Sequence, residues 1–166
     1  MDRLFNSSLG LQLSADQIIQ TLIDFMRADE KRRYKIIIGS DSERKANGTA
    51  DFVTAIVIHR VGNGGRYFWR HGIMDKKFHT LRDRIVQEVL FSLEVAKDIL
   101  EKLNAATAVQ PDENPNWDFE IHVDVGENGA SRTMIQELVA MVRANNFEAK
   151  TKPESYAASK VADRHV

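Results

Sequence analysis

Two aspartates follow strand-like segments at corresponding places in this sequence. The stretch "KIIIGSDSE" at 35–43 runs apolar into Asp41, and "IHVDVGENG" at 121–129 runs apolar into Asp124. If the two strands are parallel neighbours, both carboxylates lie at one edge of a sheet. Like charges in such a place need a cation between them, and carboxylate oxygens suit Mg²⁺ or Mn²⁺. The pair therefore indicates a divalent-metal site, and a turn-forming role for each aspartate is the alternative.

A site for two metal ions requires further carboxylates on neighbouring elements. A helix expected from about 79 to 103 offers Asp83, Glu88, Glu94, Asp98 and Glu101. Glu88 follows Ile85 by one helical turn and lies at the margin of the apolar stripe, whereas the later acids project toward solvent. Glu88 is therefore the acid on this helix that is placed to reach the sheet edge, unless it is an ordinary surface glutamate.

The C-terminal segment adds two more acids, Glu154 and Asp163. Glu154 directly follows an expected strand, and Asp163 lies on the side of a terminal helix opposite Ala157 and Val161. Helical periodicity alone predicts an exposed Asp163. Spacing alone makes neither acid a ligand.

The elements that must position these residues begin with a helix over about 14–29, opened by the capping box Ser14 and Gln17. Strands are expected at 34–41, 52–61, 66–73, 119–125 and 147–152, and further helices at 79–103, 131–146 and 155–165. The order after the first helix is β-β-β-α-β-α-β-α. It predicts an α/β fold with a five-stranded mixed sheet, in which the fourth strand pairs in parallel beside the first.

The third expected strand combines basic and aromatic side chains, in "RYFWR" at 66–70. Such a pattern can clamp and stack single-stranded nucleic acid. A half-buried strand produces the same pattern more often. The structural interpretation is therefore preferred.

Composition limits the class of protein. The 166 residues suit one domain, spanning 1–166 with a core over about 34–166, and the chain has no cysteine. No signal peptide or membrane-spanning run is evident, so a cytoplasmic protein without a membrane partner is expected. The net charge of −1 argues against tight non-specific binding of a polyanion.

Taken together, "IIIGSDSE", Glu88, "IHVDVGENG" and "KPESYAASKVADRH" resemble a bacterial family of ribonuclease-H-like proteins, the YkuK type, from about Lys35 to His165. The resemblance implies a ribonuclease H fold whose acids hold two Mg²⁺ ions. It implies Asp41 on the first strand, Glu88 on the helix and Asp124 on the fourth strand as ligands. The fourth ligand is Asp163, as in many superfamily members, or Glu154, as in the type-2 enzymes, with Asp163 slightly preferred.

The same resemblance implies hydrolysis of phosphodiester bonds in RNA, DNA or a hybrid. Candidates for binding the substrate's phosphates are Arg132, Lys152, Lys160 and Arg164, which could equally be surface charges. The first strand reads "SDSE" where type-1 enzymes have Asp-Gly-Ser, and no type-1 basic handle is evident. A non-catalytic nucleic-acid-binding or scaffold domain on the same fold is therefore the main alternative.

Two further alternatives are weaker. "VDVGENGASR" at 123–132 suggests the phosphate loop of an actin-like or sugar-kinase enzyme, but such enzymes need a second lobe. "DSE" after a strand suggests an integrin-like metal-adhesion site, but Glu43 and Lys45 stand where that motif has serines.

Overall fold

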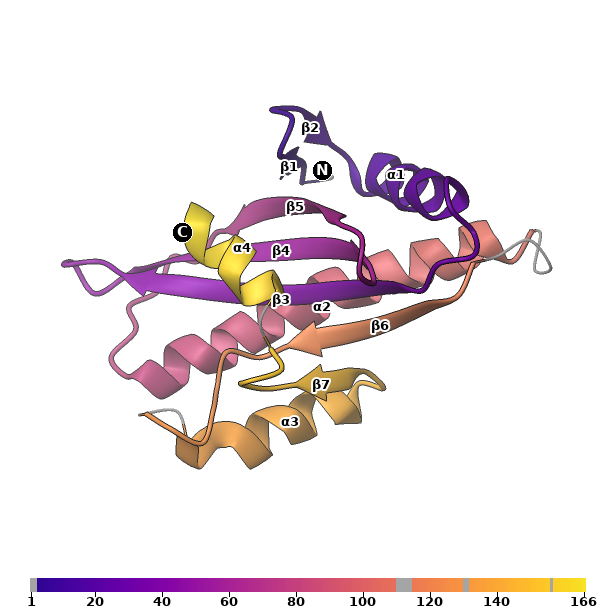
Figure 1. Ribbon diagram of the computed structural model, residues 1–166. Coiled ribbons are helices and arrows are strands. Elements are labelled where there is room, and N and C mark those ends of the chain that lie inside the picture. The colour runs from indigo at the N-terminus through magenta and orange to yellow at the C-terminus, as the bar shows by residue number, and fades with distance from the viewer. Residues whose placement is uncertain (1–2, 110–114, 130–131, 156) are drawn as a thin grey trace.

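A mixed sheet of seven strands organises the part of the chain that the structure describes, residues 3–109, 115–129, 132–155 and 157–166 of a computed structural model (Figure 1). The strands are β1 (Phe5–Ser7), β2 (Gln12–Leu13), β3 (Tyr34–Arg44), β4 (Ala50–Arg60), β5 (Gly65–Gly72), β6 (Trp117–His122) and β7 (Glu148–Lys150). The helices are α1 (Ala15–Arg27), α2 (Leu81–Thr107), α3 (Ile135–Ala144) and α4 (Ala157–His165), and a 3₁₀ turn at Arg132–Met134 precedes α3.

Strand β3 lies in the middle of the sheet, whose order is β2-β1-β5-β4-β3-β6-β7. It pairs antiparallel with β4 and parallel with β6, as the sequence predicts. Its consecutive Ile36, Ile37 and Ile38 are all buried, since helices cover both faces of the sheet. The α/β fold class with a mixed sheet is therefore confirmed.

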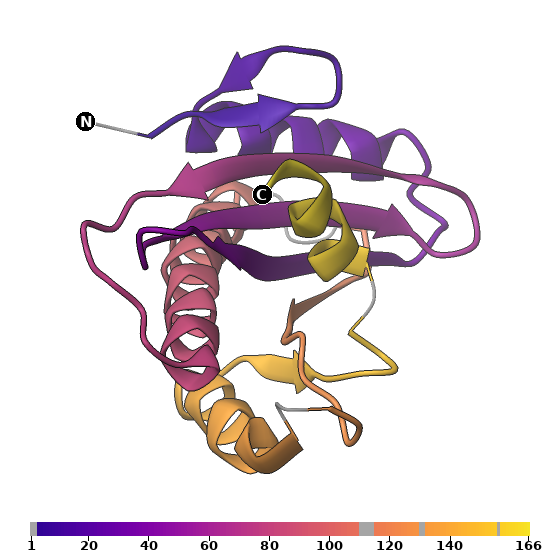
Figure 2. The same ribbon diagram turned by 90° about the vertical axis from the view of Figure 1, so that its left-hand side faces the viewer.

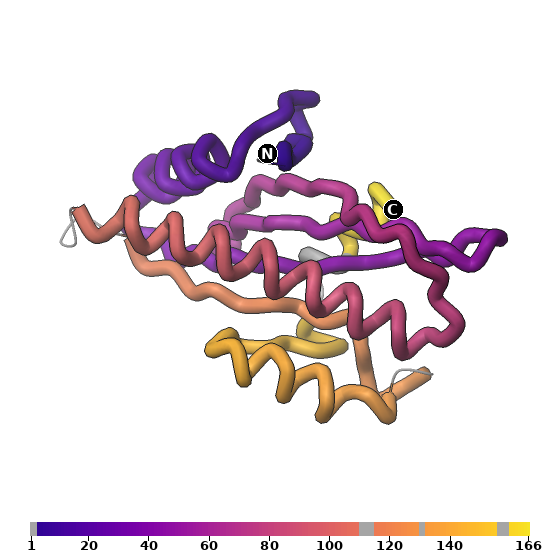
Figure 3. Tube along the Cα trace, turned by 180° about the vertical axis from the view of Figure 1, so that it is seen from behind, coloured from indigo at the N-terminus to yellow at the C-terminus, as the bar shows by residue number. Residues whose placement is uncertain are grey.

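Helices α2 and α4 lie on opposite faces of this sheet. Helix α2 crosses the back and α4 crosses the front, over β3 and β4 (Figures 1 and 3). The helix α1 joins α2 in the main core on the back, with its capping box formed by Ser14 and Gln17. Helix α3 and β7 lie at the edge farthest from the N-terminal strands (Figure 2).

Two elements differ from the sequence-based expectation. The sheet has seven strands instead of five, because β1 and β2 extend it beyond β5. Strand β3 does not end at Asp41 but continues to Arg44, because the β3–β4 pairing runs on to Ala50. Asp41 is therefore a strand residue, opposite Val53, and not a turn residue.

The basic and aromatic side chains of β5 have partners within the fold. Trp69 stacks on His165 of α4 with ring centroids 3.7 Å apart, and Arg70 lies over the ring of Phe5 at 4.6 Å. Phe68 is buried on the face opposite Trp69. These contacts agree with the half-buried interpretation of this strand.

Within the described ranges, no helix has the length and apolar character needed to cross a bilayer.

Candidate metal and nucleic-acid site

Asp41 lies on β3, and Asp124 lies at the equivalent position just beyond the end of the neighbouring strand β6. The last parallel pair of β3 and β6 is Gly39 with His122, and each aspartate follows two residues later. Because side chains alternate along a strand, both carboxylates face the same side of the sheet, the side that α4 covers. They line an open pocket of about 520 Å³, hereafter the acidic pocket. Its other lining residues are Lys152, Pro153, Ser155, Lys160 and Asp163.

The terminal helix brings a third aspartate to this pocket. Val161 and Ala162 pack on Ile37 and Val53 of the sheet, which places Asp163 over the strand ends. The carboxyl group of Asp163 is a hydrogen-bond partner of Asp41 and contributes to the raised pKa of Asp41. Asp163 remains exposed, as periodicity predicts, yet it lies at the acidic pocket because this pocket is open.

The pKa of Asp41 reflects this crowding. Burial, followed by the hydrogen bond with Asp163 and the charges of Asp124 and Asp163, raises the pKa of Asp41 to about 6. The backbone N–H of Ser42, which donates to Asp41 Oδ1 at 2.8 Å, opposes that rise. A divalent cation relieves such repulsion, because it favours the charged form of every carboxylate around it.

Glu88 approaches from the other face of the sheet. It lies on α2 with only 8% of its surface exposed, and it accepts a hydrogen bond from Ser42 Oγ. Burial is the main cause that raises the pKa of Glu88 to about 8, with Asp41 adding to the rise. Arg84 Nη1 donates to the carbonyl oxygen of Ser42 at 3.1 Å. Glu88 therefore contacts the residue next to Asp41 and does not line the acidic pocket.

The structure separates the two candidates for the fourth acid. Glu154 is exposed and lies 3.8 Å from Lys150 Nζ, away from the lining of the acidic pocket. The neighbouring Ser155 lines that pocket in its place. The geometry therefore groups Asp163, and not Glu154, with Asp41 and Asp124.

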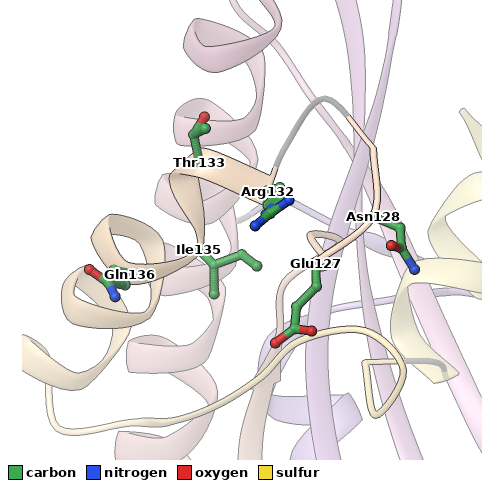
Figure 4. A pocket seen from close by; sticks show the side chains of 6 residues that line it. All are labelled: Glu127, Asn128, Arg132, Thr133, Ile135 and Gln136. Carbon is green, nitrogen blue, oxygen red and sulfur yellow. The ribbon is translucent and has the colours of Figure 1, made fainter.

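The four candidate cations are also divided. Lys152 Nζ lies 2.9 Å from Asp124 Oδ1, and Lys160 lines the same pocket. Arg164 is exposed on α4 and is not part of the lining. Arg132 lies in a neighbouring pocket, with Glu127, Asn128, Thr133, Ile135 and Gln136 (Figure 4).

Sequence reasoning missed three polar residues near the site. Glu120 and His122 face the same side of β6 as Asp124, and His122 Nε2 lies 2.8 Å from Glu120 Oε1 in a buried pair. Strand alternation could have identified both. Ser155 is 3% exposed, and its Oγ has no hydrogen-bond partner among the described residues. No sequence signal marks Ser155.

The donor set fits a hard divalent cation by its chemistry. Carboxylate oxygens are the ligands that Mg²⁺ and Mn²⁺ prefer, and three aspartates surround the acidic pocket. As the side chains stand, no three acids or histidines of the described residues are grouped closely enough to hold one ion. Lys152 instead pairs with Asp124, so its ammonium group competes with a cation for this carboxylate.

Comparison with known proteins agrees with this architecture. A family model described as Ribonuclease H-like matches residues 17–166. The chain is 31% identical over 165 residues to the uncharacterized protein YkuK of Bacillus subtilis (strain 168). The matched region covers 97% of this chain and 95% of that protein. No solved structure matched the chain. The resemblance seen in the sequence is thereby confirmed, and the chain belongs to the ribonuclease H-like family.

Proposed function

We propose that this chain is a divalent-metal-dependent nuclease that hydrolyses phosphodiester bonds of RNA, DNA or a hybrid. One observation carries the proposal: Asp41, Asp124 and Asp163 reach the same open pocket from two strands and a helix. Carboxylates gathered at a sheet edge, with lysines beside them, are suited to binding Mg²⁺ or Mn²⁺ together with a phosphate. Membership of the ribonuclease H-like family supports the same function.

In this proposal Asp41 and Asp124 hold the metal, and Asp163 completes the ligand set. A bound divalent ion supplies Lewis acidity, which activates a water for attack on phosphorus and stabilises the leaving oxygen. The pKa of about 6 at Asp41 leaves this carboxyl largely ionised at neutral pH. Below this pKa, Asp41 must release its proton when a cation binds, because only charged carboxylates are ligands.

Lys152 and Lys160 are the proposed phosphate contacts. Both line the acidic pocket, and Lys152 Nζ is 2.9 Å from Asp124 Oδ1. When a cation takes over neutralisation of Asp124, the Lys152 ammonium group becomes available for a phosphate oxygen. A lysine acts on phosphate as a mobile point charge, which suits this exchange.

Glu88 has a positioning role in this proposal. Its pKa of about 8 keeps it protonated through most of the neutral range, and it is held by Ser42 Oγ. Ser42 in turn donates its backbone N–H to Asp41. Glu88 thus helps to fix the strand segment that presents Asp41, and it becomes a ligand only if a cation lowers its pKa.

One observation favours a second function, that of a non-catalytic nucleic-acid-binding domain. Lys152 already neutralises Asp124, and no three acids of the described ranges form a ready-made ion site. A domain that uses only its lysines would bind phosphate without cutting it. The two functions differ in their response to metal.

The test is calorimetric titration of Mg²⁺ and Mn²⁺ into the wild type, Asp41→Asn and Asp124→Asn. Glu154→Gln is the matched control, since it removes an exposed carboxylate outside the acidic pocket. The proposal predicts binding by the wild type and the control, and a loss of about 100-fold or more in both asparagine variants.

Cleavage of end-labelled RNA, DNA and hybrid duplexes then identifies the substrate. Metal-dependent cleavage by the wild type, abolished in Asp124→Asn, is the expected result. Nucleic-acid binding with no cleavage at millimolar Mg²⁺ or Mn²⁺ would instead establish the non-catalytic function.

A further inference from the structure

The acidic pocket continues into a groove along α3. Lys152 and Pro153 also line a second pocket of about 410 Å³, together with Gly126, Glu127 and Asn128. Glu127 and Asn128 in turn line the pocket of about 600 Å³ shown in Figure 4. That pocket shares Ile135 and Gln136 with one of about 680 Å³ along α3. Because each pocket shares lining residues with the next, they form one path, hereafter the α3 groove.

The rim of the α3 groove is rich in hydrogen-bond donors. Arg132, Gln136 and Arg143 are exposed at successive places along it, and Asn128 lies between them and Lys152. Neither arginine has an ion-pair partner in the part of the chain that the structure describes. The acid in the lining is Glu127. The groove therefore has an excess of positive charge, which attracts phosphate.

The floor of the α3 groove is apolar. Ile135 and Val139 are partly exposed there, beside Ala140 and Ala144. Pro153 lies at the end of the groove that joins the acidic pocket. Base faces of an unpaired strand pack well on such a floor, whereas a duplex hides its base faces in the stack. Charge on the rim and apolar surface on the floor together favour a single strand.

We propose that the α3 groove binds single-stranded nucleic acid and leads it into the acidic pocket. Backbone phosphates contact Arg132 and Arg143, bases lie on Ile135 and Val139, and the strand passes Asn128 and Pro153 to reach the aspartates. Helix α3 spans about 15 Å, enough for a few nucleotides of track. This inference rests on the proposed function, because it names the form of nucleic acid that reaches the acidic pocket.

Binding is measured by fluorescence anisotropy in EDTA, with single-stranded oligonucleotides of about two to twelve nucleotides and the duplex of the longest one. The test variant combines Arg132→Glu and Arg143→Glu. The matched control combines Lys31→Glu and Lys97→Glu, two exposed lysines outside the acidic pocket and the α3 groove, with the same change in charge. The neutral pair Arg132→Gln and Arg143→Gln serves if the charge reversal unfolds the chain.

The wild type should gain affinity with length up to a plateau and bind the single strand more tightly than the duplex. The groove variant should lose about tenfold or more, and its slope of log affinity against log salt should fall by about 1.4, for two lost phosphate contacts. The control should stay within about twofold of the wild type. Equal losses in the control and the groove variant, equal affinity for the duplex, or no binding at all would overturn the proposal.

Hydrolysis of bis(p-nitrophenyl) phosphate with Mn²⁺ separates this inference from the proposed function. The diester is small enough to occupy the acidic pocket alone, so cleavage of the diester by the wild type reports the proposed function without the α3 groove. If the wild type binds single strands through the groove but never cleaves the diester or a nucleic acid, the nuclease proposal is wrong and the inference about the α3 groove is retained.

Light scattering is the last check. A dimer that dissociates in the groove variant would show that α3 contacts a second copy of the chain, and would overturn the inference.

Discussion

The two faces of β3 and β6 are built from opposite chemistry. On the side of α2 lie Ile36, Ile38, Ile121 and Val123, all buried in the main core. On the side of α4, the row formed by Glu120, His122 and Asp124 lies beside Asp41. The residues of the first face lose water and gain packing, whereas on the other face like charges come together at the acidic pocket, beyond the buried Ile37. The difference shows that the same two strands stabilise the fold along their length and hold crowded carboxylates where they end.

The largest effect on folding is expected on the apolar face. Ile38 is fully buried, so Ile38→Ala should lower the free energy of unfolding by about 2–5 kcal/mol, through lost burial and a cavity. Metal affinity should not change, because Ile38 faces away from the acidic pocket. Chemical denaturation and calorimetry measure the two quantities. A parallel loss of metal binding by a still folded variant would contradict the separation of the faces.

The next effect concerns the third aspartate of the polar face. Asp163→Asn should weaken Mg²⁺ binding by about 10–100-fold, because it removes a carboxylate that is hydrogen-bonded to Asp41. Glu154→Gln is the control and should bind as the wild type does, since Glu154 faces Lys150. A larger loss of Mg²⁺ affinity in Glu154→Gln than in Asp163→Asn would show that Glu154 is the ligand and that α4 must shift to admit it.

A pH titration sharpens the comparison at Glu88. Its pKa is raised from 4.5 to about 8 in the folded state, so folding binds a proton between these values. The contribution of Glu88 to stability is complete below pH 4.5 and is lost as pH rises through about 8. Glu88→Gln should therefore match the wild type at pH 4 and exceed its unfolding free energy by up to about 5 kcal/mol at pH 9.

This comparison uses urea denaturation in EDTA at both pH values. Asp41 contributes a slope of the same sign in both proteins, with its pKa raised to about 6 in the wild type. A variant less stable than the wild type at pH 9 would show that Glu88 is charged and well paired in the folded protein.

The smallest effect is expected at Lys152. Its ammonium group competes with a cation for Asp124, but it is 58% exposed, so the ion pair stabilises by no more than about 1 kcal/mol. Lys152→Met should therefore raise Mg²⁺ affinity by up to about fivefold, measured by calorimetry. Weaker Mg²⁺ binding in this variant would show that Lys152 positions Asp124 rather than competing with the metal.

The sequence predicts the central strands better than the elements that surround them. Consecutive isoleucines at 36–38 indicate a central strand, and the positions of Asp41 and Asp124 follow from a parallel pairing. The resemblance to ribonuclease-H-like proteins pointed in the same direction. These inferences succeed because burial on both faces leaves a strong local pattern.

The remaining features depend on tertiary contacts. Strands β1 and β2 are too short to leave a periodic pattern, and they form because Phe5 is buried beneath Arg70 at the sheet edge. Asp163 reaches the acidic pocket only because Val161 and Ala162 pack on the sheet. Glu88 lies on the α2 side of the sheet, where it accepts a hydrogen bond from Ser42. The helical periodicity of the sequence does not predict this partner.

The most direct test of a metal site at the polar face is a crystal structure with Mn²⁺, read by anomalous diffraction. The account predicts a peak about 2.0–2.4 Å from carboxylate oxygens of Asp41 and Asp124, with Lys152 moved away from Asp124. At saturating Mn²⁺, no peak at these aspartates and an intact Lys152–Asp124 ion pair would contradict it.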